Sequence, residues 1–328
     1  MNAIAVICIM GGSAMAQEYV WEEVTLEADF AGRDGAGIVV YEDKMWLLGG
    51  WNPGDKVNFP AICNSEVWSS TDGAEWTLKL LKAPWEGRHT AGYAVHDQKM
   101  WIVGGDCIAG EYQTDVWSTA DGVDWTLVNP KVPWWRRVLH HTVVHDQKIW
   151  VLGGQTLPGF IASEDEDIYY NDVWCSEDGA EWTRVTEHAP WAPRGMIGGS
   201  AVMNGRMWLL GGGTYDTPDH PQRLFYNDVW SSADGVNWEC HTEAAPWEPR
   251  QYHEVAVFDG KLWVMEGYEG VANRKDVWYS EDGTNWTELK DTPWAPRHAA
   301  SVCVYDGGLW MIAGNNMFPD AWKLTRRE

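Results

Sequence analysis

Residues 88–134 read RHTAGYAVHDQKMWIVGGDCIAGEYQTDVWSTADGVDWTLVNPKVPW, and variants of this unit follow one another along nearly the whole chain. The unit begins with an arginine and contains a Gly-Gly pair, an acid two residues before a tryptophan, and an Asp-Gly pair. It ends on a tryptophan that follows proline, and all but two of the 25 tryptophans occupy one of four positions in it. The Gly-Gly pairs and their variants recur about every 53 residues, a period typical of propeller blades.

We expect four short strands in each unit, and we call them A to D in chain order. Strand A is exemplified by 91–95 and strand B by 45–48, whose continuous apolar run indicates burial on both faces. A two-residue turn such as Asp97-Gln98 joins A to B in a geometry that requires positive φ. Strand C contains the acid and its tryptophan, and the Asp-Gly turn leads into strand D.

The two ends of the chain predict how the ring closes. Residues 20–26 have the character of a strand D with no strand C before it, whereas the chain reaches 323–325 without a final strand D. We therefore expect the N-terminal strand to complete the last blade, which removes two exposed sheet edges. The prediction is an all-β, six-bladed propeller formed by residues 17–328 as one domain.

These landmarks resemble the kelch repeat: an arginine before strand A, Gly-Gly after strand B, and a tryptophan in strand D. The resemblance covers residues 17–328, and the last two units depart from it because Glu266 and Ala313 replace the first glycine. It implies a kelch-type β-propeller. Kelch propellers include protein-binding scaffolds, plant specifier proteins, copper oxidases and a sialic-acid mutarotase, so the fold does not select a function.

Residues 1–16 differ from the rest of the chain because they carry no charge and contain the apolar run 3–10. They end in Ala14-Met15-Ala16, which is typical of a cleavage site, so we predict a signal peptide and a secreted or periplasmic protein. The net charge of −24 makes a nucleic-acid partner unfavourable. No apolar run is long enough to span a membrane. We expect a monomer without a cofactor.

The cysteines suggest one disulfide, and no CxxC or Cys/His spacing indicates a zinc site. Cys63 and Cys107 fall at similar places in the loops of neighbouring blades, so they are a candidate disulfide if the compartment is oxidising. Cys175, Cys240 and Cys303 lie inside strand patterns, where a small buried thiol is the usual interpretation.

Residues that recur in every blade are expected to serve packing, whereas a functional site breaks the symmetry. An arginine precedes strand A and an acid precedes strand C in each blade, so we interpret the two columns as blade-linking salt bridges. The arginines are Arg33, Arg88, Arg137, Arg194, Arg250 and Arg297, and the acids are Glu66, Asp115, Asp172, Asp228, Asp276 and Asp320. The variable B–C and D–A loops emerge together, and we look for ligands on this B–C/D–A face.

Two tryptophans lie outside the repeat, Trp51 in the first B–C loop and Trp135 beside Arg136. An exposed indole stacks on a sugar ring, and an adjacent guanidinium binds a carboxylate. The alternative is that each tryptophan fills a local gap. Tyr252 and His140, at the start of strand A, are further ligand-binding candidates, although His140 also suits core packing.

The fifth blade is the most irregular. Glu266 replaces a glycine, and Tyr268, Glu269 and Arg274 follow it. This stretch resembles a blade of the sialic-acid mutarotase, which uses a glutamate and an arginine six residues apart. Arg274 matches that arginine, but Tyr268 stands at the glutamate position and Glu269 is one residue away. Tyr268 and Arg274 are also ligand-binding candidates.

His253 and Glu254 begin strand A of the same blade, and a carboxylate there is costly to bury unless it is paired or solvated. If the protein is an enzyme, the residues expected to act are Glu254, Glu266, Glu269, His253 and Arg274. The acidic run 164–167 in blade 3 suits either calcium or a solvated loop.

These residues lead to one main expectation and two alternatives. The main one is a non-catalytic module that binds a glycan or small molecule on the B–C/D–A face. The alternatives are a sugar-acting enzyme of the mutarotase type and a protein–protein interaction scaffold.

Overall fold

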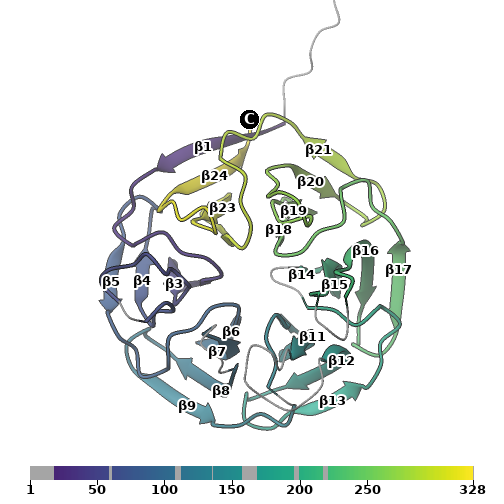
Figure 1. Cartoon of the computed structure of the whole chain (residues 1–328), viewed down its shortest axis with the longest axis horizontal. Helices are drawn as coiled ribbons and strands as arrows, with labels where there is room; N and C mark the ends of the chain where they lie inside the picture. The colour runs from purple at the N-terminus through teal and green to yellow at the C-terminus, as the bar shows by residue number, and fades with distance from the viewer. Residues whose placement is uncertain are drawn as a thin grey trace, which may run out of the picture.

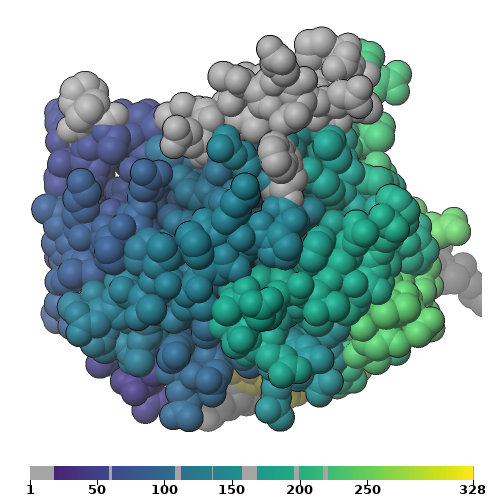
Figure 2. Space-filling model, turned by 90° about the horizontal axis from the view of Figure 1, so that it is seen from below, coloured from purple at the N-terminus to yellow at the C-terminus, as the bar shows by residue number. Residues whose placement is uncertain are grey.

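The computed structural model describes residues 18–58, 61–107, 112–134, 136–156, 168–195, 199–216 and 221–327. Within these ranges, 24 strands form six four-stranded antiparallel sheets arranged as blades around a central channel (Figure 1). Seen edge-on, the first four blades follow one another along the rim in chain order (Figure 2). The predicted all-β, six-bladed propeller is confirmed.

The strands of each blade are given below in the order A to D, and strand A lines the channel. In blade 6, strand D is the N-terminal strand β1. Blades 1 and 2 consist of β2 (Gly37–Tyr41), β3 (Lys44–Leu48), β4 (Val67–Ser70), β5 (Thr77–Leu80), β6 (Gly92–His96), β7 (Lys99–Asp106), β8 (Tyr112–Thr119) and β9 (Trp125–Asn129). Blades 3 and 4 consist of β10 (His141–His145), β11 (Lys148–Thr156), β12 (Ile168–Ser176), β13 (Thr183–Thr186), β14 (Ser200–Met203), β15 (Arg206–Gly213), β16 (Phe225–Ser232) and β17 (Trp238–Thr242). Blades 5 and 6 consist of β18 (Glu254–Phe258), β19 (Lys261–Met265), β20 (Val277–Ser280), β21 (Thr287–Leu289), β22 (Ser301–Tyr305), β23 (Gly308–Ile312), β24 (Ala321–Arg326) and β1 (Tyr19–Thr25).

The N-terminal strand closes the ring as predicted. β1 is the outermost strand of the sixth blade and pairs antiparallel with β24, with Trp21 opposite Leu324 (Figure 1). Tyr19 packs edge-on against Trp263 of blade 5, with ring centroids 4.9 Å apart. Closure therefore adds an aromatic contact between blades as well as a backbone ladder.

The A–B turns adopt the positive φ that two-residue hairpins require. Asp97 and Gln98 have φ of 45° and 55°, and Asn204 and Gly205 have φ of 52° and 70°. These turns lie opposite the B–C/D–A face because successive strands in each blade are antiparallel.

The glycine of the Asp-Gly turn is where one blade packs on the next. A methyl group added to Gly235 would lie 2.4 Å from Cζ3 of Trp150 in the preceding blade. The same contact recurs at Gly73 with Trp310, Gly122 with Trp46, Gly179 with Trp101, and Gly283 with Trp208. Only glycine lets the indole approach this closely, so two of the sequence columns meet at each of these contacts.

The repeated arginines and acids form buried ion pairs, so both columns are structural, but the prediction that they link blades is wrong because each arginine pairs with the acid of its own blade. Arg297 contacts Asp320 at 2.6 Å, and the indole N–H of Trp322 donates to the same carboxylate at 2.8 Å. The other pairs are Arg33 with Glu66, Arg88 with Asp115, Arg137 with Asp172, Arg194 with Asp228, and Arg250 with Asp276. The tryptophans that follow proline are buried between blades: Trp85, Trp134, Trp191, Trp247 and Trp294.

Some expectations lie outside the described residues, namely the signal peptide at 1–16, the acidic run 164–167 and Trp135. No helix in the described part of the chain is long and apolar enough to cross a membrane.

Candidate functional site

A series of backbone hydrogen bonds joins blades 5, 6, 1 and 2 around the channel on the B–C/D–A face. The N–H of Thr90 donates to the carbonyl of Gly35, and the N–H of Gly35 donates to Ala299, both at 3.0 Å. The N–H of Ala299 in turn donates to the carbonyl of Tyr252 at 2.8 Å. These residues, and Leu139 in blade 3, all stand two positions after the repeated arginine and have φ between 51° and 57°. The shared conformation belongs to the repeat, so only the side chains distinguish one blade from another.

Side chains at three of these positions belong to a buried apolar cluster, which we call the apolar plug. Leu139, Tyr252 and Ala299 pack together with Tyr112 and Val138 in one buried cluster. Tyr215 and Tyr268 are partly buried against the same cluster. The plug is asymmetric because the equivalent residues in blades 1 and 2 are Gly35 and Thr90, which are not part of it.

Arg223, in the B–C loop of blade 4, lies among four aromatic rings at this mouth. Its guanidinium carbon is 4.5 Å from the ring centroid of Tyr215, 5.1 Å from that of Tyr268 and 5.2 Å from that of Phe225. The centroid of Tyr252 is 5.8 Å away, and the Tyr252 hydroxyl accepts a hydrogen bond from Nη2 at 3.2 Å. Such contacts with aromatic faces stabilise a cation. We call Arg223, Tyr215, Phe225, Tyr252 and Tyr268 the Arg223 cluster.

The charge of Arg223 is not neutralised by an ion pair. Its Nε and Nη2 both donate to Oε1 of the buried Gln251 amide, at 3.0 and 2.8 Å, and no carboxylate in the described residues lies within ion-pair distance. His298 packs on Tyr252 with ring centroids 5.0 Å apart. Burial, reinforced by the nearby Arg223, lowers the pKa of His298 to about 4, so this imidazole is neutral at pH 7. Among the described residues, the half-buried Arg223 guanidinium at the channel mouth therefore has no carboxylate partner.

Two ligand-binding candidates, Tyr252 and Tyr268, are brought together around Arg223. Two other candidates pair with each other instead, because Nη2 of Arg274 donates to the carboxylate of Glu269. This ion pair joins Arg274, which matches the mutarotase arginine, to Glu269, which stands one residue from the mutarotase glutamate position.

Two further ligand-binding candidates, Trp51 and Arg136, make contacts of other kinds. Trp51 extends the sheet of blade 1 by bridging to Asp34 and Cys63, and its indole is partly buried. Arg136 is exposed, and its backbone carbonyl accepts a hydrogen bond from the Thr156 hydroxyl.

His140, His253 and Glu266 are buried between blades. His253 lies against Gly211, where an added methyl group would be 2.9 Å from the imidazole, and its Nε2 is 2.9 Å from the carbonyl oxygen of Leu210. Burial, followed by a neighbouring arginine, lowers the pKa of both histidines to about 3. Burial raises the pKa of Glu266 to about 8. All three are therefore largely neutral at pH 7.

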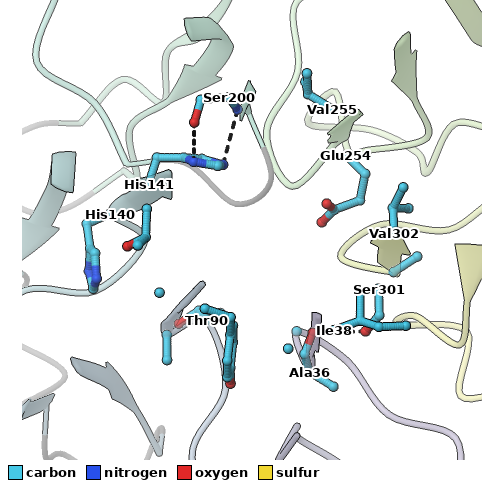
Figure 3. A pocket seen from close by; sticks show the side chains of 17 residues that line it. Ala36, Ile38, Thr90, His140, His141, Ser200, Glu254, Val255, Ser301 and Val302 are labelled. Atoms are coloured by element: carbon cyan, nitrogen blue, oxygen red, sulfur yellow. Dashed lines mark hydrogen bonds between the residues drawn. The ribbon is translucent and has the colours of Figure 1, made fainter. Parts of the chain in front are cut away.

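Glu254 lies in a separate place, the cavity inside the channel. This cavity of about 180 Å³ is lined by the first residues of the inner strands, among them His141, Ser200 and Ser301. Figure 3 shows the Glu254 carboxyl group turned toward the centre of the channel, while His141 accepts a hydrogen bond from the backbone N–H of Ser200 at 3.1 Å. Burial, and then the neighbouring Glu266, raise the pKa of Glu254 well above its usual value. Burial in this cavity therefore favours the protonated form of Glu254.

Sequence reasoning missed Arg223 and Tyr215. The available signal was that Arg223 belongs to no repeat column and has no column acid to pair with.

Comparison with known proteins agrees with this architecture. Over 84 residues the chain is 35% identical to the leucine-zipper-like transcriptional regulator 1 homolog of Drosophila melanogaster. This stretch is 24% of the chain and 8% of that relative, so the chain spans a small part of the relative's length. The model of the KLHDC2/KLHL20/DRC7 Kelch-repeats domain matches residues 139–325, which is more than half of the chain. The chain therefore belongs to the kelch-repeat family.

Proposed function

We propose that this protein is a non-catalytic interaction module that binds a protein partner through its B–C/D–A face, with the Arg223 cluster at the centre of the interface. The observation that carries the proposal is an arginine held among four aromatic rings at the channel mouth, with no carboxylate partner in the part of the chain that the structure describes. Arginine and tyrosine are enriched among the residues that dominate the binding energy of protein interfaces. The membership of the kelch family supports the same kind of role.

The geometry also indicates what Arg223 recognises. Nε and Nη2 are engaged by Gln251 and Tyr252, and no described hydrogen bond uses Nη1. This nitrogen is available to a carboxylate or backbone carbonyl of a partner. The net charge of −24 disfavours a strongly acidic partner, so we expect a partner that is neutral or basic overall. The carboxylate or carbonyl that accepts a hydrogen bond from Arg223 would then be a local feature of the partner's surface.

A glycan is the second candidate ligand, and the specific observation in its favour is that Tyr215 and Tyr268 are only partly buried. Aromatic faces of this kind stack on sugar rings, and a guanidinium binds the carboxylate of an acidic sugar. The sugar-acting enzyme is less well supported because Glu269 and Arg274 are paired with each other. A location outside the cytoplasm remains a prediction, and N-terminal sequencing of the protein from its native source tests it.

Selection of a random peptide library on immobilised wild-type protein tests the proposal, with counter-selection on the Arg223→Gln variant. We expect peptides that are retained by the wild-type protein and not by the variant. A glycan array probed with the same two proteins forms the second arm. Arg223-dependent glycan binding without peptide binding would favour the second candidate, and peptides that ignore the substitution would contradict the proposed site.

A further inference from the structure

Two cysteines from neighbouring blades meet beside a histidine near the channel mouth. Cys63 lies in the B–C connection of blade 1 and is 2% exposed, whereas Cys107 directly follows β7 of blade 2 and is half-buried. Both are free cysteines. The sulfur of Cys107 interacts with the thiol and with the backbone N–H of Cys63. The candidate disulfide partners are therefore neighbours in space.

A charged imidazole accompanies the two thiols. Nδ1 of His89 lies 3.9 Å from the sulfur of Cys63 and 2.5 Å from a carboxylate oxygen of Asp106. Burial opposes protonation of His89, but the Asp106 carboxylate outweighs this effect and raises the pKa of the imidazole to about 9. His89 therefore carries a positive charge at pH 7, which favours a thiolate nearby.

The pKa values of the two thiols are shifted in opposite directions. A reactive pair needs one thiol that readily forms a thiolate and a second thiol that closes the disulfide. The interaction with Cys63 lowers the pKa of Cys107 to about 7, with His89 acting in the same direction and burial and Asp106 against it. The pKa of Cys63 is raised by its interaction with Cys107, by burial, and by the charges of Asp106 and Asp34. The interaction with Cys63 thus favours the thiolate form of the more accessible Cys107.

We propose that Cys107 and Cys63 form an oxidant-reactive dithiol, in which Cys107 reacts with a hydroperoxide and Cys63 then closes a disulfide between blades 1 and 2. In the first step the Cys107 sulfur attacks a peroxide oxygen and the O–O bond breaks. The sulfur is oxidised by two electrons to a sulfenic acid, and the peroxide is reduced, releasing water from hydrogen peroxide. In the second step the Cys63 sulfur attacks the sulfenic sulfur, and the departing hydroxide leaves as water with the Cys63 proton.

Cys240 is a control within the same molecule, because it is more exposed than Cys107. Burial, together with Asp228 and Glu243, raises the pKa of Cys240 above its usual value. If exposure alone decided reactivity, Cys240 would be oxidised first. If thiolate character decides it, Cys107 is oxidised first, although the lower nucleophilicity of an acidic thiolate offsets part of the advantage.

The experiment treats the reduced full-length protein with hydrogen peroxide at about pH 7 and follows each cysteine by peptide mapping. We expect the Cys63–Cys107 disulfide to form at least about fivefold faster than any oxidised form of Cys240. Faster oxidation of Cys240, or oxidation of Cys107 that never yields this disulfide, would overturn the proposal.

Two substitutions separate the roles of the two sulfurs. With Cys63→Ser, dimedone should trap a sulfenic acid on Cys107 because no resolving thiol remains. With Cys107→Ser, Cys63 should no longer react with peroxide. Unchanged oxidation of Cys63 in the Cys107→Ser protein would contradict the assignment, and the wild-type comparison with Cys240 stands even if a variant folds poorly.

Discussion

The carboxylate of Glu266 accepts a hydrogen bond from the backbone N–H of Ala300 at 3.0 Å, across the boundary between blades 5 and 6. At the preceding boundary the same space holds the imidazole of His253, packed against Gly211. The two boundaries are complementary in size. Between blades 4 and 5 the small Gly211 faces the large His253. Between blades 5 and 6 the large Glu266 faces the small Ala300. Glu266 is therefore a packing residue with an ionisable group.

This arrangement makes the stability of the protein depend on pH through Glu266. Burial raises its pKa from 4.5 to about 8 in the folded state, so the folded protein holds the proton more tightly than the unfolded chain. The stabilisation is complete below pH 4.5 and is lost as the pH rises to about 8. We expect Glu266→Gln, which keeps an oxygen acceptor but cannot ionise, to weaken this pH dependence by up to a few kcal/mol.

Denaturant unfolding of both proteins between about pH 5 and about pH 8 measures this difference. Groups without an electrostatic interaction with Glu266 titrate in both proteins and cancel in the comparison, whereas Glu254 and Asp34 interact with Glu266, so the measured difference includes the change in their titration. Parallel stability profiles would show that Glu266 has an ordinary pKa.

The contact between Gly235 and Trp150 predicts a position where alanine is not tolerated. Gly235 has φ of 72°, and an added methyl group would lie 2.4 Å from the indole. Gly205 is a matched control, because its φ is 70° but no atom lies within 4 Å of the added group. Both alanine variants bear the left-handed conformation, which costs about 1–2 kcal/mol. We expect Gly235→Ala to lose about 1–3 kcal/mol more, as for other overpacked sites, and equal unfolding midpoints would contradict the packing scheme.

The ion pair between Arg297 and Asp320 predicts a large loss of stability when one partner is removed. The two side chains are 0% and 3% exposed, so Asp320→Ala leaves a buried guanidinium without its counter-charge. We expect this substitution to lower the free energy of unfolding by about 3–5 kcal/mol. Glu187→Ala removes the partner of Arg184 in an exposed pair and should cost less than about 1 kcal/mol. Similar effects of the two substitutions would mean that the arginine ring is not structural.

Most of the fold was predictable because packing repeats with the sequence. The columns that meet at Gly235 and Trp150, or at Arg297 and Asp320, recur from blade to blade, so a single chain shows them without any comparison. The closing strand was predictable for the same reason, because an unpaired strand D stands at one end of the repeat and is missing at the other.

The site was harder to predict because it depends on contacts between loops of different blades. Tyr252 and Tyr268 were ligand-binding candidates, but their common neighbour Arg223 comes from a loop of a different blade. Likewise, the position of Glu266 after strand B suggested a catalytic role. Its carboxyl group is instead buried and accepts a hydrogen bond from Ala300 of the following blade. Neither relationship follows from periodicity or spacing.

The most direct measurement of the central claim is the affinity of a library-selected peptide for the wild-type protein and for two arginine variants, determined by calorimetric titration. Arg223→Gln should weaken binding by roughly tenfold or more, as expected for a central interface arginine, with little change in the unfolding midpoint. Arg184→Gln is the matched control, because Arg184 also lies over an aromatic ring, that of Trp174, but on an outer strand away from the channel. Its affinity should equal that of the wild-type protein. Equal affinity of the Arg223→Gln protein, or an equal loss in the Arg184→Gln protein, would contradict a binding site centred on Arg223.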